Sequence, residues 1–567
     1  MLWFWVCRSL RSPRIFGDEV NYWNYARCFH AGHRLPYWSI FADVPSQLFS
    51  LILSPVFFCH GLWDAYHLAR ILTALLMAAA VFPAYLLARC LLDRRGAALA
   101  ALLCVVVPSM VYNSMIMTEN LFYPLFIGAF YAGYRALLRG KVWDGLVAGI
   151  LFAAAFYTKP HLLVLAVAYL LCTMTWAVAR VLSSAPANWR SILSGFARRL
   201  VPVACLAAAI LPRAFLSEVP RESKAVLFGA SYVQILTANH PLDMTQLLTA
   251  WSGLVLITLL GTAFVPFAVF VASASRLRRM EERQQWFWLL AAFTWLGYTA
   301  LAARHTVLAD AGVIRIHERY IFVCFPPFFV WSLFALKQLS RTAIVLASVT
   351  ATLCAAVIIA GPGRIFMTPH VNSDSPSLTL LLEAAWHRGW SYAGLTLLVI
   401  GIGSAATLAA LSGRQRVHVA VSVMLFAAAT FGWIEFEKQW ISPLHDRLDD
   451  AARDVASTAG PDAKLGLLYE GGNWLWLWHC DFWQEQPTIL YGVDQSTELP
   501  SAFSWTSNVR AMRSAPDGKL LLGEPAPAYL LVNSQTPLPL PLTRWYPLRN
   551  GTMYLYRVPH EERDPKP

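Results

Sequence analysis

The sequence predicts a polytopic α-helical membrane protein with a small C-terminal extracytoplasmic α/β domain. Composition, apolar segment length and the spacing of basic residues are the observations behind this prediction. The chain has 567 residues, of which 57% are hydrophobic and 14% are charged, and its mean hydropathy is +0.49. Soluble proteins carry about 25% charged residues, so this chain has too few charges to coat a water-exposed surface. Soluble, disordered and fibrous classes are therefore excluded.

Long apolar segments define the predicted membrane-spanning helices, because a hydrocarbon core of about 30 Å requires roughly 20 apolar residues per helix. The apolar stretch at residues 46–58 is too short to span, and we expect an interfacial or re-entrant helix there. Twelve segments are predicted to span, at residues 65–88, 97–113, 120–138, 143–158, 160–182, 199–216, 246–274, 286–303, 320–336, 342–361, 391–412 and 417–434.

Basic residues occupy every second loop between these segments. The positive-inside rule places such loops in the cytoplasm, so residues 17–64 and everything after residue 435 are predicted to face outward. The net charge of +12 thus reflects membrane topology, and no nucleic-acid partner is expected. The six basic loops contain Arg89, Arg94 and Arg95; Arg135, Arg139 and Lys141; Arg180, Arg190, Arg198 and Arg199; Arg276, Arg278, Arg279 and Arg283; Lys337 and Arg341; and Arg414 and Arg416.

An outward-facing first loop requires a helix before it. Residues 1–7 are too few to cross a bilayer, and their charges follow the apolar stretch, unlike in a signal peptide. We therefore expect that the first helix is truncated in this sequence and that the native protein has thirteen spans.

The composition changes after Trp433, which predicts two domains: a transmembrane domain at residues 1–434 and an extracytoplasmic α/β domain at residues 435–567. The second is richer in Asp, Glu, Pro, Gly and Asn. The alternating tryptophans of residues 474–483 predict a strand, and we expect it to pack against the membrane surface rather than to bind sugar. A helix is predicted at residues 443–458 and other strands at residues 464–469, 528–532 and 552–557.

Charged residues in the apolar zone are the natural functional candidates, because each costs about 2.5–3.5 kcal/mol there. The clustered ones lie at the predicted outer ends of helices. Three are acids: Asp18 and Glu19 open the first outer loop, and Glu119 opens a later span. The other candidates are Lys159 and His161 in an outer hairpin, Arg304 beside His305 at the end of a helix, and His317, Arg319 and Tyr320 at the start of another.

Each candidate also has a structural explanation. The first-loop acids could favour the N-terminus of a helix at residues 20–30, and Glu119 could sit beside a capping Thr118. Lys159 could snorkel towards lipid headgroups, and Arg319 could pair with Glu318. A cap, however, explains one acid and not a second one 100 residues further along the chain.

Acids and cations on one face of an apolar bundle suit a transfer reaction. A carboxylate can deprotonate an acceptor hydroxyl, and Lys and Arg can neutralise a departing phosphate. Grooves between the helices can hold a long lipid tail. This combination fits transfer of a group from a polyprenyl-linked phosphate to an acceptor outside the cytoplasm.

The order and sidedness of three short motifs resemble the GT-C integral-membrane glycosyltransferases. The motifs are GDE at residues 17–19, TEN at residues 118–120 and ERY at residues 318–320. The layout is similar to bacterial relatives of protein O-mannosyltransferases and of lipid A aminoarabinose transferases. The missing first helix departs from that pattern.

The resemblance implies an inverting glycosyltransferase of the inner or plasma membrane that uses a polyprenyl-phosphate sugar. Its acceptor would be a glycan, lipid or protein at the extracytoplasmic (periplasmic) face. Asp18 would act as general base with Glu19 supporting it, and Glu119 would position the acceptor. The phosphate would be bound by Lys159, His161, Arg304, His317, Arg319 and Tyr320.

A metal and three other functions stay open. Asp18 and Glu119 could hold Mg²⁺ or Mn²⁺ with water filling the coordination shell, although the spacing does not require it. A transporter or flippase would have a similar number of helices, but it would place its charges near the bilayer midplane on related halves. An oligosaccharide ligase shares the chemistry. A catalytically inactive assembly partner is the third of these functions.

Overall fold

The computed structural model divides into two compact units. Unit 1 comprises Met1–Thr73, Ser114–Met117 and Lys438–Pro567, and unit 2 comprises Ala74–Asn113 and Thr118–Glu437. The residues described are 13, 17–32, 47–183, 189–216, 243–309, 315–362, 375–460, 463–469, 475–483, 489–492, 509–511, 513–514, 520–521, 527–533, 544–547 and 553–557.

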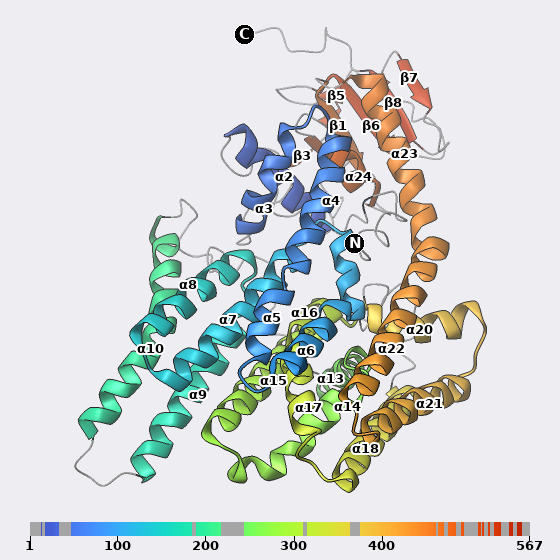
Figure 1. Ribbon diagram of the computed structural model, residues 1–567. Helices are drawn as coiled ribbons and strands as arrows, with labels where there is room; N and C mark the ends of the chain where they lie inside the picture. Colours follow the sequence, from blue (N-terminus) through green and yellow to red (C-terminus); the bar gives the residue numbers. More distant parts are fainter. Residues whose placement is uncertain are drawn as a thin grey trace. The chain divides into compact units, whose positions relative to one another are not determined.

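Unit 2 is helical, and every one of the twelve predicted spans coincides with helix (Figure 1). Helix α4 enters it from unit 1. The elements are α4 (Leu62–Ala78), α5 (Val81–Ala88), α6 (Arg94–Val106), η2 (Pro108–Ser114), α7 (Glu119–Arg139), α8 (Val142–Thr158), α9 (Leu162–Ser183), α10 (Trp189–Leu216), α13 (Met244–Gly261), α14 (Val265–Ala272), η4 (Ser273–Arg279), α15 (Glu282–Ala309), α16 (Glu318–Ile321), η5 (Phe322–Cys324), α17 (Phe325–Ala335), α18 (Arg341–Ala360), α20 (Pro376–Leu382), η7 (Glu383–His387), α21 (Tyr392–Leu411) and α22 (Gln415–Phe436).

Within the described residues, nine helices are long and apolar enough to cross a membrane, and a tenth candidate is the pair α6 and η2, bent by 56°. Two predicted spans form shorter helices: α8 has 17 residues, and the segment predicted at 320–336 is divided into α16, η5 and α17. The segment predicted at 246–274 is broken between α13, which is long enough to span, and α14. At that break Ala263 and Phe264 have φ angles of 52° and 65°, a left-handed conformation that interrupts a helix and that hydropathy does not reveal.

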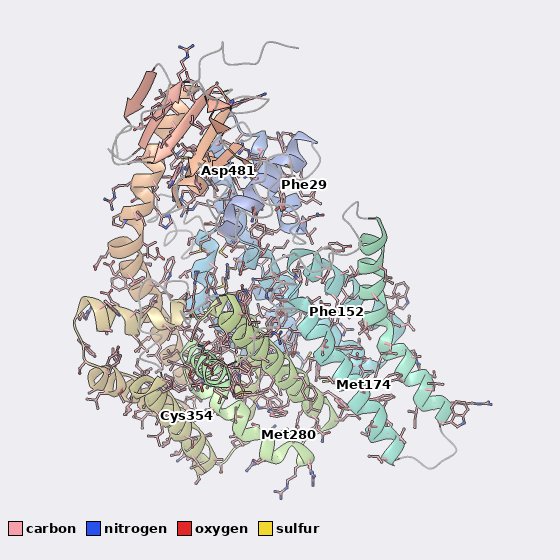
Figure 2. All side chains as sticks on the ribbon, turned by 180° about the vertical axis from the view of Figure 1, so that it is seen from behind. Phe29, Phe152, Met174, Met280, Cys354 and Asp481 are labelled. Carbon is pink, nitrogen blue, oxygen red and sulfur yellow. The ribbon has the colours of Figure 1, made fainter. Side chains whose placement is uncertain are left out.

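Close helix contacts in unit 2 depend on glycine. Helix α8 lies between α7 and α10 (Figure 1). A Cβ on Gly149 of α8 would lie 2.3 Å from Cβ of Cys205 on α10, and one on Gly403 of α21 would lie 2.2 Å from Oγ1 of Thr352 on α18. Small residues allow such close approach between membrane helices, which pack without a hydrophobic driving force. Figure 2 shows Phe152, another α8 side chain, among these neighbouring helices.

Unit 1 combines N-terminal helices with a C-terminal α/β fold. Strand β1 pairs in parallel with β2 and β6, and β8 pairs antiparallel with β6 and β7. The order of the main sheet is β3-β2-β1-β6-β8-β7, and β4 and β5 form a separate pair. The elements are α2 (Gly17–Ala31), α3 (Gln47–Leu53), η1 (Ser54–Phe58), η8 (Glu437–Ile441), α23 (Ser442–Ala459), β1 (Leu465–Tyr469), α24 (Leu475–Trp483), β2 (Ile489–Gly492), β3 (Val509–Ala511), β4 (Arg513–Ser514), β5 (Leu520–Leu521), β6 (Tyr529–Asn533), β7 (Arg544–Pro547) and β8 (Met553–Arg557).

The predictions of helix 443–458 and of strands at 464–469, 528–532 and 552–557 are confirmed. The predicted strand at residues 474–483 is wrong, because Leu475–Trp483 forms helix α24. The described side chains of α24 are all buried, because the helix packs against both α23 and α2. The alternating tryptophans suggested the wrong period.

Helices α23 and α24 are joined by a polar group around the fully buried Asp449, which we call the Asp449 cluster: His445, Asp449, Arg453, His479 and Trp483. The Arg453 side chain is 42% exposed, and the other four are buried. The Asp449 carboxylate accepts hydrogen bonds from Trp483 Nε1 and from Arg453 Nη2 at 2.8 Å, and its Oδ1 lies 3.3 Å from His479 Nδ1. His479 Nε2 lies 3.0 Å from His445 Nδ1. Helix α24, on which Figure 2 labels Asp481, also binds α2, because Asn24 Nδ2 donates to Asp481 Oδ2 at 2.7 Å.

Candidate active site

Glu119 and Lys159 form a buried ion pair in unit 2. Glu119 is the first residue of α7, and Lys159 follows the last residue of α8. Lys159 Nζ lies 2.5 Å from Glu119 Oε1, and their side chains are 7% and 1% exposed. Thr118 Oγ1 donates to Glu119 Oε2 at 3.2 Å and makes no cap to α7. The simple capping explanation for these two residues is therefore wrong.

The Tyr320 ring lies at the centre of several basic side chains. Lys159 Nζ lies 5.1 Å from the ring centroid and Arg319 Cζ lies 5.3 Å from it. The His161 ring stacks on it with centroids 4.7 Å apart. Tyr320 itself is 6% exposed, so these contacts form in a water-poor environment that strengthens electrostatic interactions.

Two further histidines complete this group, which we call the Tyr320 cluster: Glu119, Lys159, His161, His305, His317, Arg319 and Tyr320. His305 Nε2 lies 3.4 Å from the Tyr320 hydroxyl, and the His317 and Tyr320 ring centroids lie 5.2 Å apart. Four elements supply the cluster: the start of α7, the α8–α9 connection, the end of α15 and the start of α16.

Lys159, Arg319 and three histidines lie around the Tyr320 ring, and these bases affect His161. Burial holds the pKa of His161 well below its usual value, and the charges of Lys159, His305 and Arg319 act in the same direction. His161 is therefore neutral at pH 7, while Lys159 and Arg319 supply the fixed positive charges. Such a site can accept an anion.

Glu318 anchors the segment that carries Arg319 and Tyr320. Its fully buried carboxylate accepts hydrogen bonds from Ser109 Oγ at 2.5 Å, Ser377 N at 2.8 Å and Ser377 Oγ at 2.9 Å. Ser375 Oγ donates to the Ile316 carbonyl at 2.5 Å. Because η2 and α20 hold Glu318 from two sides, the start of α16 is fixed, and with it the Tyr320 ring.

The structure brings together Glu119, Lys159, His161, His317, Arg319 and Tyr320 of the predicted site. Arg304 is partly exposed on α15. The neighbouring His305, which the sequence placed at the helix end without a binding role, contacts Tyr320. Sequence reasoning also missed the structural role of Glu318, whose partners lie 209 and 59 residues away.

The first-loop acids belong to unit 1. Asp18 lies in the first turn of α2, and its side chain is outside the described residues. Glu19 is buried, and its Oε1 accepts a hydrogen bond from the Ile116 amide at 2.7 Å. Its carboxylate thus holds the segment Ser114–Met117, a contact that the helix-capping explanation did not foresee.

The predicted divalent cation finds limited support in these residues. Among the residues the structure describes, no group of three or more His, Cys, Asp or Glu side chains could hold a metal ion. Glu119 Oε1 already accepts a hydrogen bond from the Lys159 ammonium. This positive charge weakens the attraction of the Glu119 carboxylate for a metal cation. The described carboxylate therefore does not fit the predicted metal ligand, and the cation stays a prediction.

Long apolar helices together with a C-terminal α/β fold define a multi-pass membrane protein. The structure is similar to ArnT from Cupriavidus metallidurans, at 16% identity, over 100% of this chain and 97% of that one. The TM-score is 0.54 for its apo state and 0.59 for ArnT bound to undecaprenyl phosphate. At this identity the likeness establishes the fold. The fold that the resemblance implies is thus confirmed.

Sequence comparison agrees over part of the chain. Residues 64–208 match the sequence model of the dolichyl-phosphate-mannose-protein mannosyltransferase family. This region contains Glu119, Lys159 and His161 of the Tyr320 cluster. No curated protein sequence matches the chain.

Proposed function

We propose that this protein transfers a sugar from a polyprenyl-phosphate-linked donor to an acceptor at the outer face of the inner or plasma membrane. The observation that carries the proposal is the pair of fixed cations, Lys159 and Arg319, held against the buried Tyr320 ring. The similar fold of ArnT with undecaprenyl phosphate supports a lipid-phosphate donor, and so does the family match at residues 64–208.

The basic cluster suits the charge change of this reaction. The sugar C1–O bond to the phosphate breaks, and its electron pair stays on the phosphate oxygen. A phosphodiester with one negative charge thereby becomes a phosphate monoester with about −1.5 to −2 charges at pH 7. Lys159 and Arg319 would stabilise this growing negative charge. Because the charge is larger in the transition state than in the ground state, these two cations would stabilise the transition state more and so accelerate the reaction.

The other cluster residues would hold these cations in place. Glu119 would fix the Lys159 ammonium, because the two groups are 2.5 Å apart. The Tyr320 ring would orient both cations through its negative face. His161, His305 and His317 would line the phosphate site, with His161 as a neutral hydrogen-bonding group. Arg304 would contribute positive charge from the edge of this region.

The acceptor would be activated from the first loop. Asp18 would take the proton of the acceptor hydroxyl while its oxygen attacks C1 opposite to the leaving phosphate, which inverts the anomeric centre. Glu19 would support this loop through its bond to the Ile116 amide. The acceptor itself is a glycan, a lipid or a protein in this proposal.

Transfer of label from a radiolabelled polyprenyl-phosphate sugar in membranes tests the proposal. We expect transfer by the wild-type protein, and its loss in Asp18→Asn at unchanged expression. Substantial transfer by Asp18→Asn would show that Asp18 is not the general base. Absence of transfer from every donor, with folded protein, would instead favour a transporter or an assembly partner.

Adding a chelator to the same transfer assay tests whether the reaction requires the predicted divalent cation. If Mg²⁺ or Mn²⁺ takes part, EDTA abolishes transfer and one of these ions restores it. Transfer that survives EDTA would leave the carboxylates with acid–base roles only.

A further inference from the structure

Unit 2 contains an apolar groove that the proposed reaction does not use. It has a volume of about 560 Å³ and lies between α5, α7 and α8, next to the end of α4. One face of α7 forms its floor, through residues including Leu121, Leu125, Gly128 and Ala132. No residue of the Tyr320 cluster lines it.

The groove has the length and the surroundings of a lipid chain. From Leu121 to Arg135, α7 advances 14 residues, or about 21 Å at about 1.5 Å per residue, which is more than half of a hydrocarbon core of about 30 Å. Its rim exposes Phe82 to 71%, Val147 to 51% and Leu86 to 46%. In a membrane protein such side chains face acyl chains, so the groove opens towards lipid.

One end of the groove is polar. Arg135 Nη2 donates to Asp144 Oδ1 and its Nη1 donates to the Tyr131 hydroxyl, both at 3.0 Å. Arg139 Nη1 lies 3.9 Å from Asp144 Oδ2. Two buried atoms remain without a hydrogen-bond partner among the described residues: the donor Nε of Arg135 and the acceptor Oδ2 of Asp144. Buried polar atoms are rarely left unsatisfied.

An unsatisfied donor and an unsatisfied acceptor at one end of an apolar groove match a headgroup that carries both kinds of partner. The phosphate of a phospholipid accepts from Arg135 and is attracted by Arg139, and a primary ammonium donates to Asp144. A choline headgroup has a cation but no N–H donor. A glycerol headgroup has hydroxyl donors but no cation, so it lacks the stronger charge-assisted bond to Asp144.

We propose that this groove binds one ethanolamine phospholipid. An acyl chain lies along α7 from Arg135 towards Leu121, the phosphate lies at Arg135 and Arg139, and the ammonium lies at Asp144. The site is separate from the Tyr320 cluster, so its occupancy can be measured without any assay of transfer.

Native mass spectrometry of the detergent-purified full chain tests the headgroup. The probes are phosphatidylethanolamine, phosphatidylcholine and phosphatidylglycerol with identical acyl chains. We expect the ethanolamine lipid to be retained roughly tenfold better than the other two, as expected for one charge-assisted hydrogen bond. Asp144→Asn should reduce its retention to that of the choline lipid. Equal retention of all three lipids by the wild type would overturn the proposal.

A matched pair of glycine variants tests the groove itself. Gly128 lies in the groove, where an added Cβ meets only Leu151 and Pro83 at 3.9 Å, and Gly401 on α21 has no atom within 4 Å of an added Cβ. Leucine at position 128 should fill the groove and abolish specific ethanolamine-lipid retention, whereas Gly401→Leu should retain it. Unchanged retention in Gly128→Leu would contradict the site, and so would displacement of the lipid by undecaprenyl phosphate at equal concentration.

Discussion

The Tyr320 cluster and the Asp449 cluster are both buried and charged, but they are built in opposite ways. In unit 1 a carboxylate is central, and Trp483, Arg453 and His479 surround it as donors. In unit 2 an aromatic ring is central, and Lys159, Arg319 and three histidines surround it. In the first arrangement a carboxylate is shared by all the donors, whereas the second has one carboxylate, Glu119, on Lys159 and an excess of bases that can bind an anion from outside.

This difference separates structural from functional use of buried charge. A carboxylate whose donors come from its own and a neighbouring helix ties those helices together. A ring can orient several cations without neutralising them. Substitutions in the Asp449 cluster should therefore affect stability, and substitutions in the Tyr320 cluster should affect transfer.

The largest expected effect lies in the Asp449 cluster. Asp449→Ala leaves Arg453, His479 and Trp483 without their shared acceptor. His479 and Trp483 are buried, and each buried donor left unsatisfied costs about 1–3 kcal/mol. Thermal unfolding in detergent should occur at a markedly lower temperature. The exposed neighbour Asp450→Ala is the control and should change little. An unaltered melting temperature in Asp449→Ala would show that the cluster does not join α23 to α24.

Substitution of Lys159 should have the next largest effect, and it should act on transfer. Removal of one group that stabilises developing charge typically costs 10²–10³ in rate, or about 2.7–4 kcal/mol. Lys159→Met leaves Glu119 buried beside an apolar side chain, so the double variant Glu119→Gln with Lys159→Met separates folding from chemistry. We expect the double variant to fold and to remain at least about 100-fold slower.

Arg283→Gln is the matched control for charge, because that side chain is 55% exposed and binds Glu281. It should transfer at the wild-type rate. A wild-type transfer rate in the Glu119→Gln, Lys159→Met variant would show that the Tyr320 cluster does not stabilise the leaving phosphate.

Glu318 should act as a positioning residue with a smaller effect. Glu318→Ala leaves Ser109 and Ser377 without their acceptor, which costs about 1–3 kcal/mol, and it loosens the start of α16. Glu318→Gln keeps an oxygen acceptor for the Ser377 amide and should recover most of the loss. Positioning predicts that kcat falls more than KM changes in Glu318→Ala. An equal loss of kcat in Glu318→Ala and Glu318→Gln would instead indicate that the negative charge of Glu318 is required.

How far the sequence predicts the molecule differs between fold and site. Hydropathy located all twelve helical segments because a hydrocarbon core imposes one length on each span. It did not locate the break at Ala263 and Phe264, which is a backbone property of two residues. At residues 474–483 the tryptophans at every second position predicted a strand, whereas Leu475–Trp483 forms a helix.

For the site, the sequence located residue types but not their partners. Glu119 and Lys159 were separate candidates, and 40 residues separate them in the chain. Nothing in the spacing reveals that they pair, or that Tyr320 is central to the bases. Their meeting depends on how α7, α8, α15 and α16 pack, and helix packing leaves little periodic trace in one sequence.

The smallest expected effect concerns the pH dependence of stability through His161. Its pKa in the folded protein lies well below the ordinary value of about 6.5, so the unfolded chain binds more protons between these two pKa values. Stability contributed by neutral His161 is therefore complete above about pH 6.5 and decreases as the pH falls towards the folded-state pKa. His161→Gln cannot be protonated, so its melting temperature should fall less between pH 7 and pH 5 than that of the wild type. His30→Gln, at an exposed position on α2, should keep the wild-type pH profile. A His161→Gln profile parallel to that of the wild type would mean that the bases around Tyr320 do not disfavour a further positive charge, and the contrast with the Asp449 cluster would then disappear.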